Sequence, residues 1–129
     1  MTRRASCSCG RLRVVCRAEP LRVSVCHCLA CKQRTGSAFG VQARFDARDV
    51  EIEGESTAFT RVADSGNEVT FHFCATCGST VFWRLGELVA IAVGAFADPG
   101  FPEPTFSVYE ARQHSWVRLA PTCELERWD

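Results

Sequence analysis

Apolar and polar residues alternate along most of the chain, which is the pattern of β-strands with one buried face. Leu12, Val14 and Cys16, for example, fall on one face of such a strand. We expect strands at residues 2–9, 11–17, 21–28, 38–45, 50–53, 57–62 and 68–74. Residues 81–83 and 88–93 are apolar at almost every position, which indicates central strands buried on both faces. No segment has the pattern of a strong amphipathic helix, so the sequence predicts a mainly β fold of short strands.

Turn-forming residues separate the expected strands. Gly10 follows the first strand, and residues 64–67 are typical of a hairpin loop between two β-type segments. Cys28 and Cys31 are spaced i, i+3, which brings their side chains together on a helical turn or a tight loop. We expect the polar residues 32–37 to end that turn.

Length, composition and charge limit the class of protein. A chain of 129 residues, 47% of them hydrophobic, lies in the range of one globular domain, so we expect residues 1–129 to form a single domain. No apolar run is long enough for a secretory signal or a membrane span, which indicates a soluble, cytoplasmic protein with no membrane partner. Fifteen basic and fifteen acidic residues cancel, so no overall positive field favours nucleic acid as a partner.

The nine cysteines favour metal binding over disulfides. An odd number leaves at least one thiol unpaired, and disulfides are rare in a reducing compartment. The pairs Cys7/Cys9 and Cys74/Cys77 are each followed at once by glycine, which permits a tight turn beneath a metal ion. Four thiolates complete a tetrahedral zinc ion, so the two pairs predict one closed structural site. The spacing alone also allows the second pair to join a third cluster, but the total would then exceed four ligands.

That third cluster, Cys26, Cys28 and Cys31, offers three ligands and leaves a position open, as catalytic zinc sites do. A reactive dithiol lacks its usual βαβ context here, and an iron–sulfur centre normally uses four cysteines. His27 is an alternative fourth ligand, but strand alternation turns it away from its two cysteine neighbours. An open zinc position binds a thiolate or polarises a carbonyl, and both roles suit carbon–sulfur chemistry.

Other residue types that carry chemistry are scattered. Lys32 is the only lysine and directly follows Cys31; a role in the site and an arginine-rich composition explain its position equally well. We expect His72 at the surface or rim, His114 in a loop, and Cys16 as a buried thiol that behaves as a small hydrophobic residue.

The motifs occur in an order that resembles one known family. They are Cys-Ser-Cys-Gly at 7–10, Cys-His-Cys-Leu-Ala-Cys at 26–31, Arg-Thr-Gly-Ser-Ala-Phe at 34–39, Phe-Cys-Ala-Thr-Cys-Gly-Ser at 73–79 and Val-Gly-Ala-Phe-Ala-Asp-Pro at 93–99. In this order they resemble the glutathione-dependent formaldehyde-activating enzyme family, which includes centromere protein V-like proteins. The likeness covers nearly the whole chain, although the chain is shorter than the founding enzymes of the family.

The resemblance implies an Mss4-like fold, in which short antiparallel strands form folded sheets held by zinc. It implies two zinc ions, a structural one on Cys7, Cys9, Cys74 and Cys77 and a catalytic one on Cys26, Cys28 and Cys31. The implied activity is that of S-(hydroxymethyl)glutathione synthase, a carbon–sulfur lyase that joins glutathione or a similar thiol to formaldehyde or another small aldehyde. Lys32 or Arg34 would then meet a glutathione carboxylate. The main alternative is a non-enzymatic, zinc-stabilised binding module of the same fold.

Overall fold

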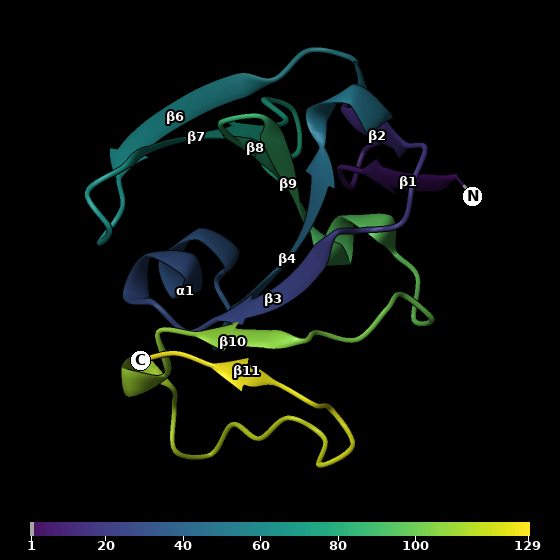
Figure 1. Ribbon diagram of the computed structural model, residues 1–129. Coiled ribbons are helices and arrows are strands. Elements are labelled where there is room, and N and C mark those ends of the chain that lie inside the picture. The colour runs from purple at the N-terminus through teal and green to yellow at the C-terminus, as the bar shows by residue number, and fades with distance from the viewer. Residues whose placement is uncertain (1) are drawn as a thin grey trace.

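Short strands dominate the computed structural model, which describes residues 2–129 (Figure 1). The strands are β1 (Arg3–Ser6), β2 (Arg13–Cys16), β3 (Arg22–Cys26), β4 (Gly40–Asp46), β5 (Val50–Glu53), β6 (Thr57–Val62), β7 (Glu68–Phe73), β8 (Thr80–Leu85), β9 (Leu88–Ala92), β10 (Phe106–Val108) and β11 (Glu126–Arg127). The helical elements are α1 (Leu29–Thr35) and the 3-10 helices η1 (Ala47–Asp49), η2 (Val93–Phe96) and η3 (Glu110–Arg112). The prediction of a mainly β fold with few helical turns is confirmed.

The strands form two sheets, one of three strands in the order β1-β2-β5 and one of eight in the order β11-β10-β3-β4-β9-β8-β7-β6. The larger sheet is strongly curled, so that β6 and β7 face β10 and β11 across the molecule (Figure 1). Helix α1 lies inside this curl. The curl therefore places side chains from both ends of the sheet around one helix.

Strand β10 pairs in parallel with both β3 and β11, whereas antiparallel strands were expected throughout. The other pairings are antiparallel, as expected. Parallel neighbours need a connection of about a dozen residues or more, and residues 109–125 provide one between β10 and β11. Alternation within a strand carries no information about such distant pairings, which is why the sequence did not indicate them.

The main hydrophobic core lies between the small sheet and the centre of the large one. Leu12 and Val14, which belong to the small-sheet side of this core, are fully buried. Val81 and Ile91 of the central strands are fully buried as well. Burying an aliphatic side chain of this size contributes about 1.5–3 kcal/mol to folding. The predicted burial on both faces is confirmed for residues 81–83 and, within the predicted run 88–93, for residues 89–91; Leu88, Ala92 and Val93 are only partly buried. Cys16 is also fully buried, and burial raises the pKa of its thiol to about 12.

Helix α1 is longer than the sequence indicated, because it continues through the polar segment that was expected to end it. Lysine, glutamine and arginine are good helix formers, so a polar composition does not stop a helix. The helix ends at Gly36, which adopts a left-handed conformation (φ 68°) and donates its N–H to the Lys32 carbonyl at 2.8 Å. Within residues 2–129, no helix combines the length and apolar character needed to cross a membrane.

Two predicted strands are shorter than expected at their cysteine ends. Strand β1 ends at Ser6 and strand β3 at Cys26, so Cys7, Cys9 and Cys28 lie in turns or caps beyond them. The expectation that the first strand, residues 2–9, includes Cys7 and Cys9 is therefore wrong. A turn brings the two side chains together instead, because glycine at position 10 allows the backbone to reverse at once (φ 84°).

Candidate functional site

The first candidate metal site joins the two sheets. It consists of Cys7, Cys9, Cys74 and Cys77, the four-cysteine cluster. The first pair lies in the turn after β1 and the second in the turn between β7 and β8. In the second turn, Gly78 has a φ of 81° and donates its N–H to the Cys74 carbonyl at 2.8 Å. The structure thus brings together the two pairs that the sequence grouped.

The sulfur positions of the four-cysteine cluster suit a tetrahedral ion. All four sulfur atoms lie within 4.8 Å of one another. The Sγ atom of Cys9 lies 3.7 Å from that of Cys7 and 3.6 Å from that of Cys74. A zinc ion with bonds of about 2.3 Å to sulfur holds neighbouring sulfurs about 3.8 Å apart. The cluster therefore fits a metal that prefers four thiolates, such as zinc.

Hydrogen bonds lower the pKa values of two cysteines in this cluster, Cys77 and Cys7. Bonding with the hydroxyl and N–H groups of Ser79, and with the Cys9 N–H, lowers the pKa of Cys77 to about 5. The Cys7 thiol is buried, which opposes ionisation, but the Leu12 N–H donates to its Sγ at 3.2 Å and its pKa is lowered overall. A metal that binds thiolates is favoured by such donors, since they stabilise the charged ligand.

The second candidate metal site lies where β3 leads into α1. It consists of Cys26, Cys28 and Cys31, the three-cysteine cluster, whose sulfur atoms also lie within 4.8 Å of one another. Cys28 is the N-cap of α1, and its Sγ accepts the Cys31 N–H at 3.3 Å. No fourth His, Cys, Asp or Glu joins this group anywhere in residues 2–129. The cluster can hold a metal ion and leave one coordination position for another molecule.

The three thiols have very different pKa values. Hydrogen bonds from the Cys26 and Cys31 thiols, and from the Cys31 N–H, lower the pKa of Cys28 to about 2. The pKa values of Cys26 and Cys31 are raised, because each must ionise beside an existing thiolate in a buried place. The cluster therefore carries one thiolate readily, and a bound cation is needed to stabilise all three.

His27 points away from both neighbouring cysteines, as predicted. It is fully buried, and its Nε2 lies 3.1 Å from the Ser107 Oγ of β10. Ser107 donates its hydroxyl to Glu110 at 2.5 Å, and Arg127 of β11 donates to the same carboxylate at 2.8 Å. His27 thus attaches the loop of the three-cysteine cluster to the C-terminal strands.

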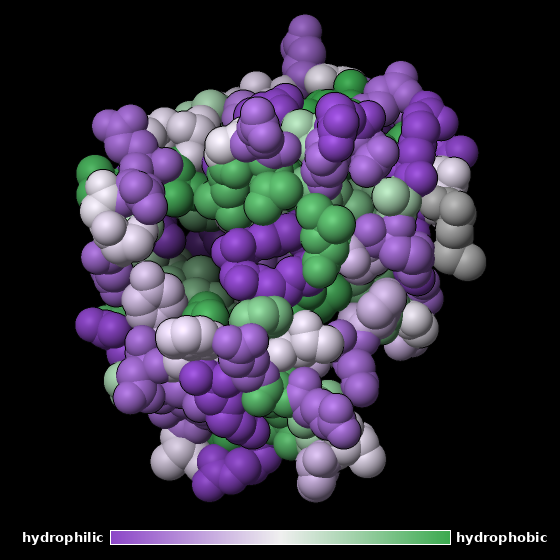
Figure 2. Space-filling model, viewed as in Figure 1, coloured by the Kyte–Doolittle hydropathy of each residue, from purple (hydrophilic) through white to green (hydrophobic). Residues whose placement is uncertain are grey.

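The three-cysteine cluster opens into a cavity of about 450 Å³, here called the thiol cavity. Strands from both halves of the curled sheet line it, together with the β6–β7 hairpin and the segment after β10. Its polar lining includes Gln42, Arg44, Arg61, Asn67 and Tyr109. The space-filling view shows the molecule hollowed between the β6–β7 end of the sheet and α1 (Figure 2). The arrangement exposes three metal-ligand sulfurs to a space large enough for a small molecule.

A profile of the family described as glutathione-dependent formaldehyde-activating enzyme matches residues 2–112, a range that contains both cysteine clusters. The chain belongs to this family. Among curated proteins, no match was found. A crystal structure of a Rhodobacter sphaeroides protein from a structural genomics programme is similar, with a TM-score of 0.55 and 17% sequence identity. The likeness covers 98% of this chain and 99% of that one, and at this identity it shows the fold alone.

The two basic residues expected to bind substrate, Lys32 and Arg34, are not among the lining residues of the thiol cavity. Lys32 donates its ammonium group to the Arg112 carbonyl. The guanidinium of Arg34 stacks over Trp83 at 4.5 Å and Phe71 at 5.4 Å. Both side chains therefore have intramolecular partners that the sequence could not indicate.

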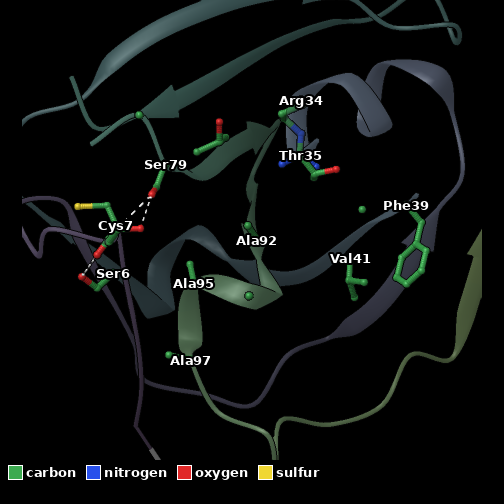
Figure 3. Close-up of a pocket in the computed structure, with 15 residues that line it drawn as sticks. Ser6, Cys7, Arg34, Thr35, Phe39, Val41, Ser79, Ala92, Ala95 and Ala97 are labelled. Atoms are coloured by element: carbon green, nitrogen blue, oxygen red, sulfur yellow. Dashed lines mark hydrogen bonds between the residues drawn. The ribbon is translucent and has the colours of Figure 1, made fainter. Parts of the chain in front are cut away.

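Arg34 instead lines a larger, separate cavity of about 780 Å³, together with its neighbour Thr35. Figure 3 shows Arg34 and Thr35 on one side of this cavity and Ser79 with Ala95 on the other. The sulfur of Cys7 points away from its centre (Figure 3). No group of three metal-ligand side chains among the described residues lines this space. Its greater volume does not make it the better candidate for thiol chemistry.

Sequence reasoning missed three residues that face the thiol cavity: Arg44, Arg61 and Tyr109. Tyr109 adopts a left-handed conformation (φ 55°) that is unusual for a residue with a side chain. Burial, the Asp64 carboxylate and the three cysteines raise its phenol pKa. No motif marked these positions, because each comes from a different strand or turn and only the curl of the sheet brings them together.

Proposed function

We propose that the chain is a zinc-dependent carbon–sulfur lyase of the S-(hydroxymethyl)glutathione synthase type. It would join a thiol, glutathione or a similar compound, to formaldehyde or another small aldehyde. The observation that carries the proposal is the three-cysteine cluster at the wall of the thiol cavity, which no fourth protein ligand among residues 2–129 completes. Membership of the glutathione-dependent formaldehyde-activating enzyme family supports the same chemistry.

The proposed roles divide the cysteines into two sets. Cys26, Cys28 and Cys31 would hold a catalytic zinc, and the four-cysteine cluster a structural zinc, within one zinc-binding domain of residues 1–129. When bound, the catalytic zinc supplies a Lewis acid that stabilises a substrate thiolate or polarises an aldehyde oxygen. A chain with this many free thiols suits a reducing cytoplasm.

The chain's own residues would prepare the cavity for this reaction. The Cys31 N–H holds the Cys28 sulfur in place, and His27 fixes the same loop through Ser107. Val69 and Trp83, both buried, form an apolar part of the cavity wall and limit the access of water to the reacting groups. Tyr109 contributes a phenol that can donate a hydrogen bond to an oxygen atom in the cavity.

The test is to measure exchange between glutathione, formaldehyde and their adduct by NMR, with and without the zinc-loaded protein. We expect acceleration over the buffer rate, and its loss in Cys28→Ser. Cys123→Ser is the matched control, because Cys123 lies outside both clusters and its thiol donates to the Glu103 carboxylate at 3.5 Å. Wild-type protein that holds two zinc ions yet leaves the rate unchanged would exclude this activity and favour the binding-module alternative.

A further inference from the structure

Arg44 lines the thiol cavity without an acidic partner. Cys26 pairs with Gly40 and Arg22 with Arg44 across β3 and β4, so Arg44 projects from the same face of the sheet as Cys26. Its Nε is buried and has no hydrogen-bond partner among the described residues. Burial, and then the charge of Arg22, lower its pKa. Arg44 is partly buried, and a partly buried cation without an acidic partner gives up hydration with no compensating ion pair, so its presence here requires another explanation.

Arg61 approaches the same cavity from the opposite side of the curl. It lies on β6 opposite Val69, which is buried and lines the cavity. Its guanidinium lies 5.3 Å from the centre of the Phe71 ring. Arg61 lines the same cavity as Cys26, Cys28 and Cys31, so its positive charge faces the space into which the three-cysteine cluster opens.

Negative charge does not balance these two arginines within the protein. Among residues 2–129, neither Arg44 nor Arg61 forms an ion pair. Asp64 is the one carboxylate in the cavity lining, and it pairs with Arg112 at 3.9 Å. The cavity therefore combines a cluster of metal-ligand thiols with two cations available to an external anion.

We propose that Arg44 and Arg61 form an anion-binding subsite that holds the carboxylate of the thiol substrate. The inference rests on the proposed function, because the three-cysteine cluster must receive the sulfur of that substrate. Guanidinium groups bind carboxylates with paired, charge-assisted hydrogen bonds. Formaldehyde has no charge, so the subsite acts on the thiol and selects thiols that carry a carboxylate. The role is assigned to these residues instead of Lys32 and Arg34 because Arg44 and Arg61 line the thiol cavity, whereas Lys32 and Arg34 are not among its lining residues.

The test compares two small thiols that differ only in charge, 3-mercaptopropionate and its neutral amide, 3-mercaptopropionamide. Their affinities for the zinc-loaded protein are measured by calorimetry in the absence of aldehyde. We expect Arg44→Gln, and separately Arg61→Gln, to weaken binding of the acid about 10-fold or more relative to the amide, because a charge-assisted hydrogen bond is lost. Arg44→Lys should restore part of the preference, since it keeps the charge without the paired geometry.

Arg17→Gln is the matched control, because it removes the same charge from an exposed arginine paired with Glu51 outside the cavity. It should keep the wild-type preference. Unchanged affinity for the neutral amide shows that a variant is folded and that its thiol site is intact. Equal weakening for both thiols in Arg44→Gln and Arg61→Gln, or a wild-type protein without preference, would overturn the subsite while leaving the lyase proposal standing. A wild-type protein that binds neither thiol overturns both.

Discussion

At the scale of single residues, the backbone at Gly54 shows how tightly the small sheet is closed. Gly54 has a φ of 92°, and a Cβ atom built there would lie 1.9 Å from the Arg11 carbonyl oxygen. Gly66 in the β6–β7 hairpin has almost the same φ, 90°, but no atom within 4 Å of such a Cβ. A comparison of alanine substitutions at the two glycines therefore separates the cost of a left-handed backbone from the cost of a steric collision.

We predict that Gly54→Ala destabilises the protein by more than about 2 kcal/mol, because a left-handed alanine and a backbone collision act together. Gly66→Ala should cost about 1 kcal/mol, since it introduces only the left-handed conformation. Urea unfolding followed by circular dichroism measures both values. Equal destabilisation by the two substitutions would show that the contact with Arg11 has no effect.

At the scale of elements, β10 holds the C-terminal segment against the loop that carries the three-cysteine cluster. Val108 accepts the His27 N–H at 3.1 Å, and Ser107 connects the His27 ring to Glu110. Both Ser107 and His27 are fully buried. The same segment places Tyr109 in the thiol cavity. A local hydrogen-bond network therefore couples the position of a metal-ligand loop to that of a cavity residue.

Ser107→Ala should lower the free energy of unfolding by about 1–3 kcal/mol, because the buried His27 ring loses its hydrogen-bond partner, while Glu110 keeps only Arg127. Ser37→Ala is the control, since Ser37 is exposed and lies in the loop after α1. Chemical denaturation of the two variants supplies the comparison. A Ser107→Ala protein as stable as Ser37→Ala would mean that the network contributes nothing measurable.

At the scale of the whole molecule, the four-cysteine cluster connects the two sheets. Its first pair follows β1 of the small sheet, and its second pair follows β7 of the large one. Cys7 and Cys74 are both part of the main hydrophobic core. Structural zinc binding contributes about 10–16 kcal/mol in small peptides, which is comparable to the whole stability of a domain at about 5–15 kcal/mol.

Removal of the proposed structural zinc should therefore abolish cooperative folding or lower the melting temperature sharply. Cys77→Ala, which removes one ligand, should act in the same direction without a chelator, whereas Cys123→Ser should melt like the wild type. Circular dichroism melts and metal analysis of each protein test this. A Cys77→Ala variant that is folded and melts normally would argue against a structural role for the cluster.

The sequence predicted the parts of this structure that depend on local spacing. Alternation identified the strands around Leu12 and Ile91, and the pairing of Cys7/Cys9 with Cys74/Cys77 followed from ligand number and adjacent glycines. It was less successful at element ends: α1 is longer than expected, and β1 ends before its cysteines. Seven residues of helix are too few to display a helical period, and a turn can align two cysteines as well as a strand can.

The sequence by itself determined the mainly β class, the division of the cysteines into a group of four and a group of three, and the direction in which His27 points. These three features depend on residue type and on the spacing of residues within short segments of the chain. Only the tertiary structure decided which cations face the three-cysteine cluster. Arg44 and Arg61 lie on strands at different positions in an eight-stranded sheet, and they meet because that sheet curls around α1. Curvature and strand order arise from packing over the whole chain, so no local pattern contains them.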